Sequence, residues 1–470
     1  MGSDELRRED VQGLLVSGYA TMHRAAYLML EVLDAEGARR WLDGLLPRIT
    51  TSLRPAERRC LNVAFTSGGL RRLGMAEADL RTFSVPFQEG MAEPHRSRIL
   101  GDRGPSDPST WEWGGPGDDQ LHILLLLFGC DADELAEVEA DELTPAVQSG
   151  AVGIVHRRTP EPLPGKVNVG KFGVEHFGFA DGMSQPVIRG SGQEHRYTGN
   201  DARRTVVEAG EFVLGYRNAY GKLTPVPRVG TETGRPWDFG RDGSYLVFRQ
   251  LAQDVAGFWQ YADSRTRGPD GSPDEEARIL LAAKMVGRWP SGAPLVRTPH
   301  RDDPDMGADN SFGYAQWDRE GLRCPIGSHT RRTNPRDVSP DARPSRALEL
   351  ANQHRLVRRG RVYGPGLETP LDGDDGTPRG LFFLCLNANI ERQFEFVQQH
   401  WCNNEKFHGL FDEADPVAGL QPGGGGRFTV QDVPVRTKHH GVPNFVTVRG
   451  GSYFFLPGVR AVRWLATGRP

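Results

Sequence analysis

One pattern occurs twice in the chain, and its two copies lie 218 residues apart. Tyr27 opens an apolar run that is followed by Trp41, and Tyr245 opens a second run that is followed by Trp259 at the same distance. Each run has the length of a strand, and the segment after it has the spacing of an amphipathic helix whose tryptophan faces the core. The sequence therefore predicts two similar halves, each containing a strand followed by a helix.

A second pair of segments supports this duplication. Residues 122–138 and residues 380–397 both read as an apolar strand that turns into a helix. Strand–helix units resemble one another in any α+β protein, so this pair is weaker evidence than the matched tyrosine and tryptophan spacings. A glycine-containing strand is also predicted before each copy, at residues 13–19 and 212–216.

The length and composition of the chain fit a duplicated fold. A chain of 470 residues is long for one simple domain, and 37% hydrophobic residues can bury a large core. Short strands mixed with helices in both halves favour α+β units with antiparallel sheets. Segment 139–210 between the halves is long and mostly irregular, and such connections are usually functional or disordered.

The charge and the cysteines narrow the class of protein. A formal net charge of −4 gives no electrostatic reason to expect a nucleic acid or an anionic membrane as partner. No stretch approaches the ~20 apolar residues that span a bilayer, and acidic residues flank Arg7-Arg8, so we expect neither a membrane anchor nor a twin-arginine export signal. Five scattered cysteines without a CxxC pair favour reduced thiols and a cytoplasmic location.

The first candidate site residue is Asp181, in the segment GFADG at residues 178–182. Gly178 and Gly182 give the backbone freedom and remove bulk, so a large, flat molecule can approach it closely. By itself, however, the segment is more typical of an ordinary Asx-turn, in which the aspartate bonds its own backbone.

The second candidate is His329, in the segment CPIGSHTRRTNPR at residues 324–336. No second histidine or cysteine stands at metal-ligand spacing, so a tetrahedral zinc site does not fit. A single protein ligand suits the iron of haem, because the porphyrin supplies the other nitrogens, and nearby arginines suit the haem propionates. The segment also suits a surface histidine in a basic loop or a phosphate-binding patch.

The third candidate is Arg358, in the segment HRLVRRGRVYG at residues 354–364. This density of arginines suits an anionic ligand, although a solvated strand edge would look similar. The strand at residues 381–384 is too apolar for anything but burial. We expect Leu381 and Phe383 of this strand to line the ligand cavity.

Together the three segments resemble the dye-decolourising peroxidase family. GFADG matches the family's GxxDG motif, CPIGSHTRRTNPR resembles the segment with its proximal histidine, and VRRGRVYG resembles the strand with its distal arginine. DVQGLLVSGY near the start, RGLFFLCLNANIERQFEFVQQHW and the closing SYFFLPG also resemble the family in the same order. The resemblance therefore covers nearly the whole chain.

The resemblance implies an α+β fold of two ferredoxin-like halves with antiparallel sheets, packed as a dimeric α+β barrel. The N-terminal half is expected at residues 1–170, and the connection with the GxxDG motif at 171–210. The C-terminal half, at residues 211–470, is expected to hold one haem b per chain.

The resemblance also implies a role for each site residue. His329 is the axial ligand of the haem iron, and Asp181 and Arg358 handle the peroxide. Asp415 is the carboxylate that bonds the proximal histidine. The remaining contacts to haem are Arg336 at a propionate, Gly178, Gly182, Leu381 and Phe383. Gly360 stands where some relatives carry a polar asparagine, so that asparagine's role is absent or taken over here.

The implied activity is that of a haem peroxidase, which reduces hydrogen peroxide and oxidises bulky organic donors such as dyes or phenols in one-electron steps. Two alternatives use the same scaffold: a protein that stores haem or releases its iron, and a haem oxidase or oxygenase of a biosynthetic pathway. An acid–base aspartate and a distal arginine favour the peroxidase over both. The expected partners are hydrogen peroxide and an aromatic electron donor, and a homo-oligomer is compatible with the sequence.

Overall fold

The computed structural model describes residues 5–53, 58–163, 173–232, 234 and 236–469. At its centre is a nine-stranded sheet in the order β4-β1-β3-β2-β13-β7-β10-β8, in which β9 also pairs with β10. All these pairings are antiparallel. The strands are β1 (Arg24–Val32), β2 (Arg59–Phe65), β3 (Ile123–Gly129), β4 (Val152–Arg158), β7 (Ser244–Gln253), β8 (Val357–Arg358), β9 (Arg361–Tyr363), β10 (Gly380–Asn387) and β13 (Val446–Leu456).

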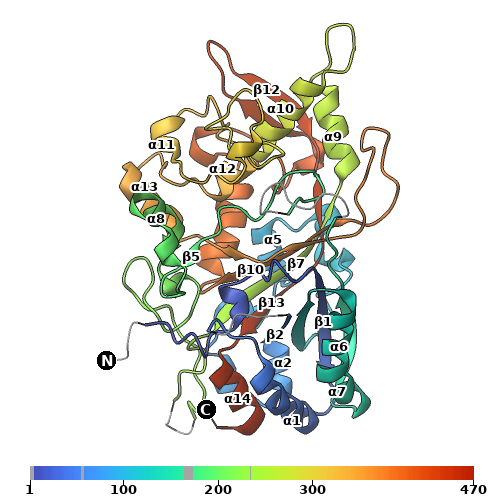
Figure 1. Cartoon of the computed structure of the whole chain (residues 1–470), viewed down its shortest axis with the longest axis vertical. Coiled ribbons are helices and arrows are strands. Elements are labelled where there is room, and N and C mark those ends of the chain that lie inside the picture. Colours follow the sequence, from blue (N-terminus) through green and yellow to red (C-terminus); the bar gives the residue numbers. More distant parts are fainter. Residues whose placement is uncertain (1–4, 54–57, 164–172, 233, 235, 470) are drawn as a thin grey trace.

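Helices surround the sheet and fill the two ends of the molecule (Figure 1). They are α1 (Ala35–Leu45), α2 (Ser67–Arg72), α3 (Glu77–Leu80), α4 (Val85–Glu89), α5 (Pro94–Leu100), α6 (Ala132–Glu142), α7 (Thr144–Gln148), α8 (Gly199–Thr205), α9 (Val255–Ser264), α10 (Glu275–Val286), α11 (Tyr314–Trp317), α12 (His329–Thr333), α13 (Pro344–Asn352) and α14 (Val459–Thr467). Two π-helical segments, Glu391–Glu395 and Val397–Cys402, follow β10. Two small sheets pair β5 (Val187–Ile188) with β6 (Val206–Val207), and β11 (Gly426–Val430) with β12 (Thr437–Val442).

The order of the strands repeats across the sheet. In β4-β1-β3-β2, the fourth, first, third and second strands of the first half lie side by side. In β13-β7-β10-β8, the strands of the second half lie in the same order. Here β8 and β9, which both pair with β10, together take the place of the second strand. This is the strand order of two ferredoxin-like halves, so the predicted α+β fold with antiparallel sheets is confirmed.

The two halves meet where β2 pairs with β13 through Phe65 and Phe455. The predicted boundary between residues 170 and 171 lies outside the described residues, and the boundary between 210 and 211 stays a prediction. Within the described parts of the chain, no helix combines the length and the apolar character needed to cross a membrane.

The predicted strand–helix copies are β1 with α1 and β7 with α9. An aspartate caps each helix, because Asp34 accepts from the N–H of Glu36 and Asp254 accepts from the N–H of Gly257. Trp41 and Trp259 are both partly buried and pack against core clusters, as their spacing predicts.

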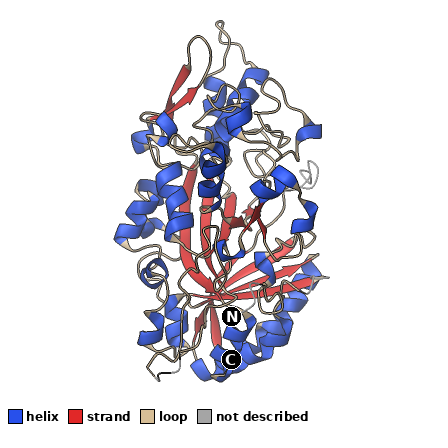
Figure 2. Ribbon diagram, turned by 90° about the vertical axis from the view of Figure 1, so that its left-hand side faces the viewer, coloured by secondary structure: helices blue, strands red, loops and turns tan. Residues whose placement is uncertain are grey.

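Helices lie on both sides of the strands (Figure 2). Alternation along the strands sends side chains into two different core clusters. On β7, Tyr245 and Val247 belong to one cluster, while Leu246 and Phe248 belong to the other. A third cluster forms beneath α9 and α10 and includes Phe177 and Phe179 of the connection between the halves. The connection is therefore packed onto the second half.

The glycine-containing strands predicted before each copy are wrong. Gly13–Leu15 is a single turn of 3-10 helix, and Tyr19 has a positive φ of 53°, which no extended strand adopts. In the second copy, the N–H groups of Phe212 and Val213 both return to the carbonyl of Ala209. Both runs are buried as apolar turns, because burial alone does not require an extended backbone.

Candidate active site

A cavity of about 1340 Å³ lies between the sheet of the second half and the helices that cover it, and it extends to residues 18–24 and 130–133 of the first half. Strands β7, β10 and β13 form one wall, and α12 with the π-helical segments forms another. The cavity brings together residues that are far apart in the sequence, and seven of the predicted site residues line it: Asp181, Gly182, His329, Arg336, Arg358, Leu381 and Phe383.

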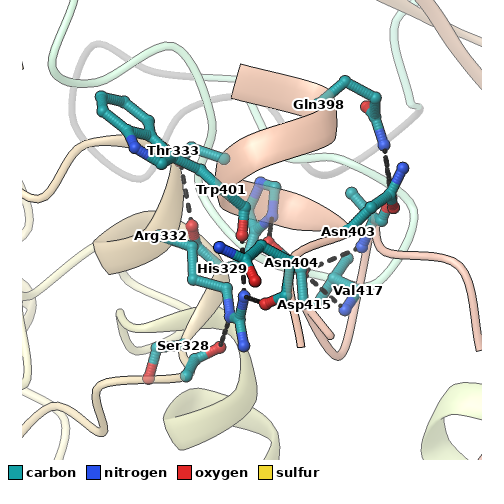
Figure 3. Close-up of polar contacts among 12 residues, drawn as sticks. Ser328, His329, Arg332, Thr333, Gln398, Trp401, Asn403, Asn404, Asp415 and Val417 are labelled. Carbon is teal, nitrogen blue, oxygen red and sulfur yellow. Dashed lines mark hydrogen bonds and ion pairs between the residues drawn. The ribbon is translucent and has the colours of Figure 1, made fainter. Parts of the chain in front are cut away.

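His329 is the first residue of α12, and its imidazole bonds a carboxylate behind it (Figure 3). The Nδ1 atom of His329 lies 2.9 Å from Oδ2 of Asp415, which is fully buried. The other oxygen of Asp415 accepts from the N–H groups of Val417 at 2.9 Å and Ala418 at 3.0 Å. Because the carboxylate can only accept, Nδ1 carries the proton of the neutral imidazole, and in that form the lone pair is on Nε2.

The charges of this pair stabilise each other. Burial favours the neutral imidazole, but the Asp415 carboxylate outweighs it, so the pKa of His329 lies above its usual value. Burial alone would raise the pKa of Asp415, but the facing His329 and the nearby Arg332 guanidinium hold it below its usual value. Asp415 is therefore ionised and keeps the imidazole in one orientation.

The two arginines that follow His329 most closely are structural. Arg332 donates to the carbonyls of Trp401 at 2.7 Å and Asn404 at 3.0 Å, beside the Asp415 loop (Figure 3). Arg331 bonds Asp318 at 3.1 Å and is also fully buried. Sequence reasoning considered both as propionate partners, yet their guanidinium groups are committed to brace α12 and the loops around it.

Asp181 is the last residue of a small hairpin at residues 173–181. Val174 and Ala180 form an antiparallel bridge, and the N–H of Asp181 donates to the carbonyl of Gly173 at 2.8 Å. Gly178 and Gly182 have φ values of 94° and 87°, which only glycine adopts without strain. Gly178 sits in the turn of this hairpin, next to Phe177 and Phe179 of the cavity wall.

The side chain of Asp181 is exposed toward the cavity. Its Oδ1 accepts from the N–H of the next residue, Gly182, at 2.6 Å. An Asx-turn would instead bond the N–H two residues on, so this contact is not the Asx-turn considered for the segment. It engages one carboxylate oxygen of a side chain that faces the cavity.

Arg358 lies on β8 and is fixed against the segment that follows Asp181. Its N–H donates to Oε1 of Gln185 at 3.0 Å, and its Nη2 donates to the carbonyl of Met183 at 2.7 Å. On the neighbouring β10, Leu381 and Phe383 point into the cavity, while the alternating residue Phe382 is buried on the other face. Strand alternation thus puts two apolar side chains beside one permanent cation.

Further arginines give the cavity a positive edge. Nη1 of Arg336 donates to the carbonyls of Asn310 at 3.0 Å and Phe312 at 2.9 Å. Arg355 donates to the carbonyl of Ser184 at 2.7 Å, and burial together with Arg336 and Arg358 lowers its pKa to about 9. Across the described residues, no carboxylate lies within ion-pair distance of Arg336, Arg355 or Arg358. This uncompensated charge suits an anionic ligand.

Arg355 and Glu175 are cavity residues that the sequence reasoning did not select. The arginine density of residues 354–361 was the signal for Arg355, but it did not identify which arginines face inward. Glu175 precedes the GxxDG motif by three residues and gave no such signal.

Comparisons with known proteins add an independent line of observation. No protein-family model matches the chain. The chain is 30% identical over 430 residues to dye-decolorizing peroxidase msp1 of Mycetinis scorodonius, covering 86% of the chain and 75% of that protein. It is 31% identical over 421 residues to dye-decolorizing peroxidase AauDyP1 of Auricularia auricula-judae, covering 86% and 74%. The solved structure of a fungal DyP-type peroxidase from Auricularia auricula-judae matches with a TM-score of 0.81 at 26% identity, over 99% of the chain and 100% of that structure.

Proposed function

Because the chain belongs to the dye-decolourising peroxidase family, we propose that its cofactor is haem b, one per chain, with His329 as the axial ligand of the iron. The protein is a peroxidase, an oxidoreductase that reduces hydrogen peroxide and oxidises bulky organic donors. The observation that carries the assignment of the site is that His329, Asp181 and Arg358 line one cavity.

Three features of the cavity support haem as the ligand. The Nδ1 bond to Asp415 leaves the Nε2 lone pair of His329 available for iron. Leu381 and Phe383 offer an apolar wall to a flat macrocycle. The buried charge of Arg336 and Arg355 suits two propionates. When bound, the haem supplies the iron at which peroxide is reduced and to which donors return electrons one at a time.

Asp181 is the proton carrier of this proposal. Before the O–O bond of hydrogen peroxide breaks, one oxygen must lose a proton and the other must gain one, so that it leaves as water. A positioned carboxylate performs both transfers. The hairpin and the bond from Gly182 hold the Asp181 carboxylate in place, so little reorganisation is needed.

Arg358 is the electrostatic partner of Asp181. Its guanidinium is a cation that donates to the carbonyl of Met183 and is held there. A preorganised cation in a buried site stabilises negative charge on the peroxide oxygens far better than mobile water does. Asp415 acts from behind His329, because an ionised hydrogen-bond partner makes the imidazole a stronger electron donor.

Four sequence predictions carry over as parts of the proposal. The C-terminal half, residues 211–470, holds the haem. The protein works in the cytoplasm, with hydrogen peroxide and an aromatic donor as partners and without nucleic acid or membrane. A homo-oligomer is compatible with this reading. Among the described residues that line the cavity, none favours the iron-releasing or the biosynthetic alternative over the peroxidase.

The test is made with haem-loaded protein and a bulky anthraquinone dye. We expect a Soret band in the purified protein, a change of that band on adding hydrogen peroxide, and loss of dye colour that requires peroxide. Arg358→Leu is the comparison variant. It should keep the Soret band, because His329 is untouched, but it should bleach the dye more slowly than wild type. Release of iron or breakdown of the haem without dye oxidation would instead support the iron-releasing alternative.

A further inference from the structure

Glu175 is a carboxyl group on the cavity wall that the proposed proton transfer does not use. It stands in the same hairpin as Asp181. Its Oε1 accepts from the N–H of Phe179 and its Oε2 from the N–H of Phe177, both at 2.9 Å. The N–H of Glu175 also donates to the carbonyl of Phe179 at 3.0 Å. One side chain therefore fills the turn of the hairpin and pairs its inward N–H groups.

The carboxyl group also ties the hairpin to the sheet. Nε2 of Gln253, the last residue of β7, donates to Oε2 of Glu175 at 2.7 Å. Trp259 of α9 donates to the carbonyl of Phe177 at 3.1 Å, and its ring stacks on Phe179. The N–H of Ala180 donates to the carbonyl of Pro290 at 3.0 Å. The hairpin is thus bonded to β7, to α9 and to the carbonyl of Pro290, and Glu175 supplies the contact to β7.

We propose that Glu175 is a positioning residue for the peroxide reaction: its carboxyl group fastens the Asp181 hairpin to β7 and so sets where the Asp181 carboxylate stands in the cavity. The inference rests on the proton-carrier role of Asp181 given above. Glu175 acts through the hairpin and need not touch the peroxide.

The protonation of Glu175 decides how firmly the hairpin is held. Burial, with a smaller contribution from the negative charge of Asp181, raises the pKa of Glu175 to about 7 against its hydrogen bonds. The neighbours from β7 and α9, Gln253 and Trp259, are uncharged, and His176 turns its ring to the carbonyl of Tyr363 on β9. Opening the hairpin would expose the carboxyl group to water and return its pKa toward the ordinary value near ~4.3.

This difference in pKa decides whether a rise in pH favours the open or the closed hairpin. The closed hairpin prefers the protonated acid and the open hairpin prefers the carboxylate, so opening becomes easier as the pH rises from about 4.5 through 7. Oε1 of Gln253 is buried without a hydrogen-bond partner, and a rotation of this amide would let it accept from the protonated Glu175. We therefore expect a firmly held Asp181 in acid and a looser one above neutral pH.

The experiment compares Glu175→Gln with wild type and with Asp79→Asn. Glutamine cannot ionise, so the variant should lose the pH dependence whatever its absolute rate. Asp79 is a matched control: it is buried and likewise accepts from two backbone N–H groups, those of Gly230 and Thr231, both at 3.1 Å, but it lies outside the cavity lining. Gln253→Met removes the hydrogen bond between Gln253 and Glu175 from the other side, and it serves as a second variant in case Glu175→Gln folds poorly.

Two measurements are made on these proteins. The first is hydrogen–deuterium exchange of the peptide that spans residues 173–181 in the haem-free protein, corrected for the intrinsic exchange rate at each pH. We expect protection in wild type and Asp79→Asn to fall several-fold between pH 5 and pH 8, and to stay constant in Glu175→Gln. The second is the rate constant for the reaction of haem-loaded protein with peroxide, which should fall as the pH rises toward 7 and stay low above it in wild type and Asp79→Asn, but not in Glu175→Gln. In Gln253→Met, hairpin protection should be lower than in wild type already at pH 5, with a roughly ten- to hundredfold slower peroxide reaction, as expected when a catalytic group is displaced.

Asp181→Asn separates this inference from the proposed function. If Asp181→Asn is slow while Glu175→Gln keeps the wild-type pH profile and exchange, Glu175 does not position Asp181 and the proposed function stands. If Asp181→Asn reacts at the wild-type rate, the proton-carrier role itself is refuted, and the inference about Glu175 with it. A wild-type hairpin whose exchange is independent of pH would also overturn the inference.

Discussion

Replacing Asp415 with asparagine should move the imidazole proton of His329 from Nδ1 to Nε2 and so weaken haem binding. One oxygen of Asp415 is occupied by the N–H groups of Val417 and Ala418, so the amide oxygen of the variant is expected to stay on that side. The amide NH2 would then face Nδ1 of His329, which can only accept from it. The imidazole proton moves to Nε2, the atom that would bind iron, and ligation requires its removal.

The size of this effect follows from the bond that is lost. The 2.9 Å contact joins an imidazole N–H to a fully buried carboxylate, and hydrogen bonds to charged groups contribute roughly 1.5–3 kcal/mol. Loss of such an outer partner of a ligating histidine typically weakens the metal site about 10- to 100-fold. We therefore expect haem affinity to fall in that range, with a shifted Soret band in the fraction that binds.

The assay is a titration of haem-free protein with haem, followed at the Soret band and by quenching of tryptophan fluorescence. Asp415→Ala is the companion variant, because it removes the carboxylate without presenting an NH2 group to His329. If the tautomer argument holds, Asp415→Asn binds haem more weakly than Asp415→Ala, although it preserves more of the local packing. Wild-type affinity and spectrum in Asp415→Asn would refute the reasoning.

Three other variants test the remaining groups. His329→Ala should lose most of its haem during purification, since no other ligand from α12 faces the cavity at this position; a normal haem content and an unchanged Soret band would contradict this. Arg358→Leu should keep its haem but react with peroxide roughly a hundred- to thousandfold more slowly, which corresponds to ~2.7–4 kcal/mol, in stopped-flow mixing; a rate within a few-fold of wild type would show that it is an ordinary structural arginine. Asp181→Asn should bind haem normally and slow the same step by ~10²–10⁴-fold, and an unaltered rate would remove the aspartate from the proton transfer.

The features that sequence could predict are those set by local spacing. The tyrosine and tryptophan spacings predicted the duplication, because a strand followed by an amphipathic helix imposes a fixed distance between its buried positions. The strands predicted at residues 13–19 and 212–216 were wrong for a related reason. A short apolar run satisfies burial as a turn as well as it does as a strand, and only the long-range pairing decides between them.

The roles of individual arginines depend on register, which sequence alone does not contain. Arg358 and Arg359 are neighbours at the end of β8, yet Arg358 contacts the segment after Asp181 while Arg359 donates to the carbonyls of Leu14 and Leu15. The hydrogen bond between Glu175 and Gln253 could not be predicted for the same reason, because it joins two elements that are far apart in the chain. Such contacts follow from tertiary packing rather than from residue type.

The strand pairing between the two halves is limited to one position, where Phe65 of β2 faces Phe455 of β13. Side chains add further contacts between the halves, such as the buried ion pair of Arg249 with Asp102 and the ring of Phe83 on Phe455. One core cluster also contains residues of both halves, among them Leu28 and Tyr245. Neither half can therefore keep its own core when the other is removed, and we expect the chain to unfold in a single cooperative transition.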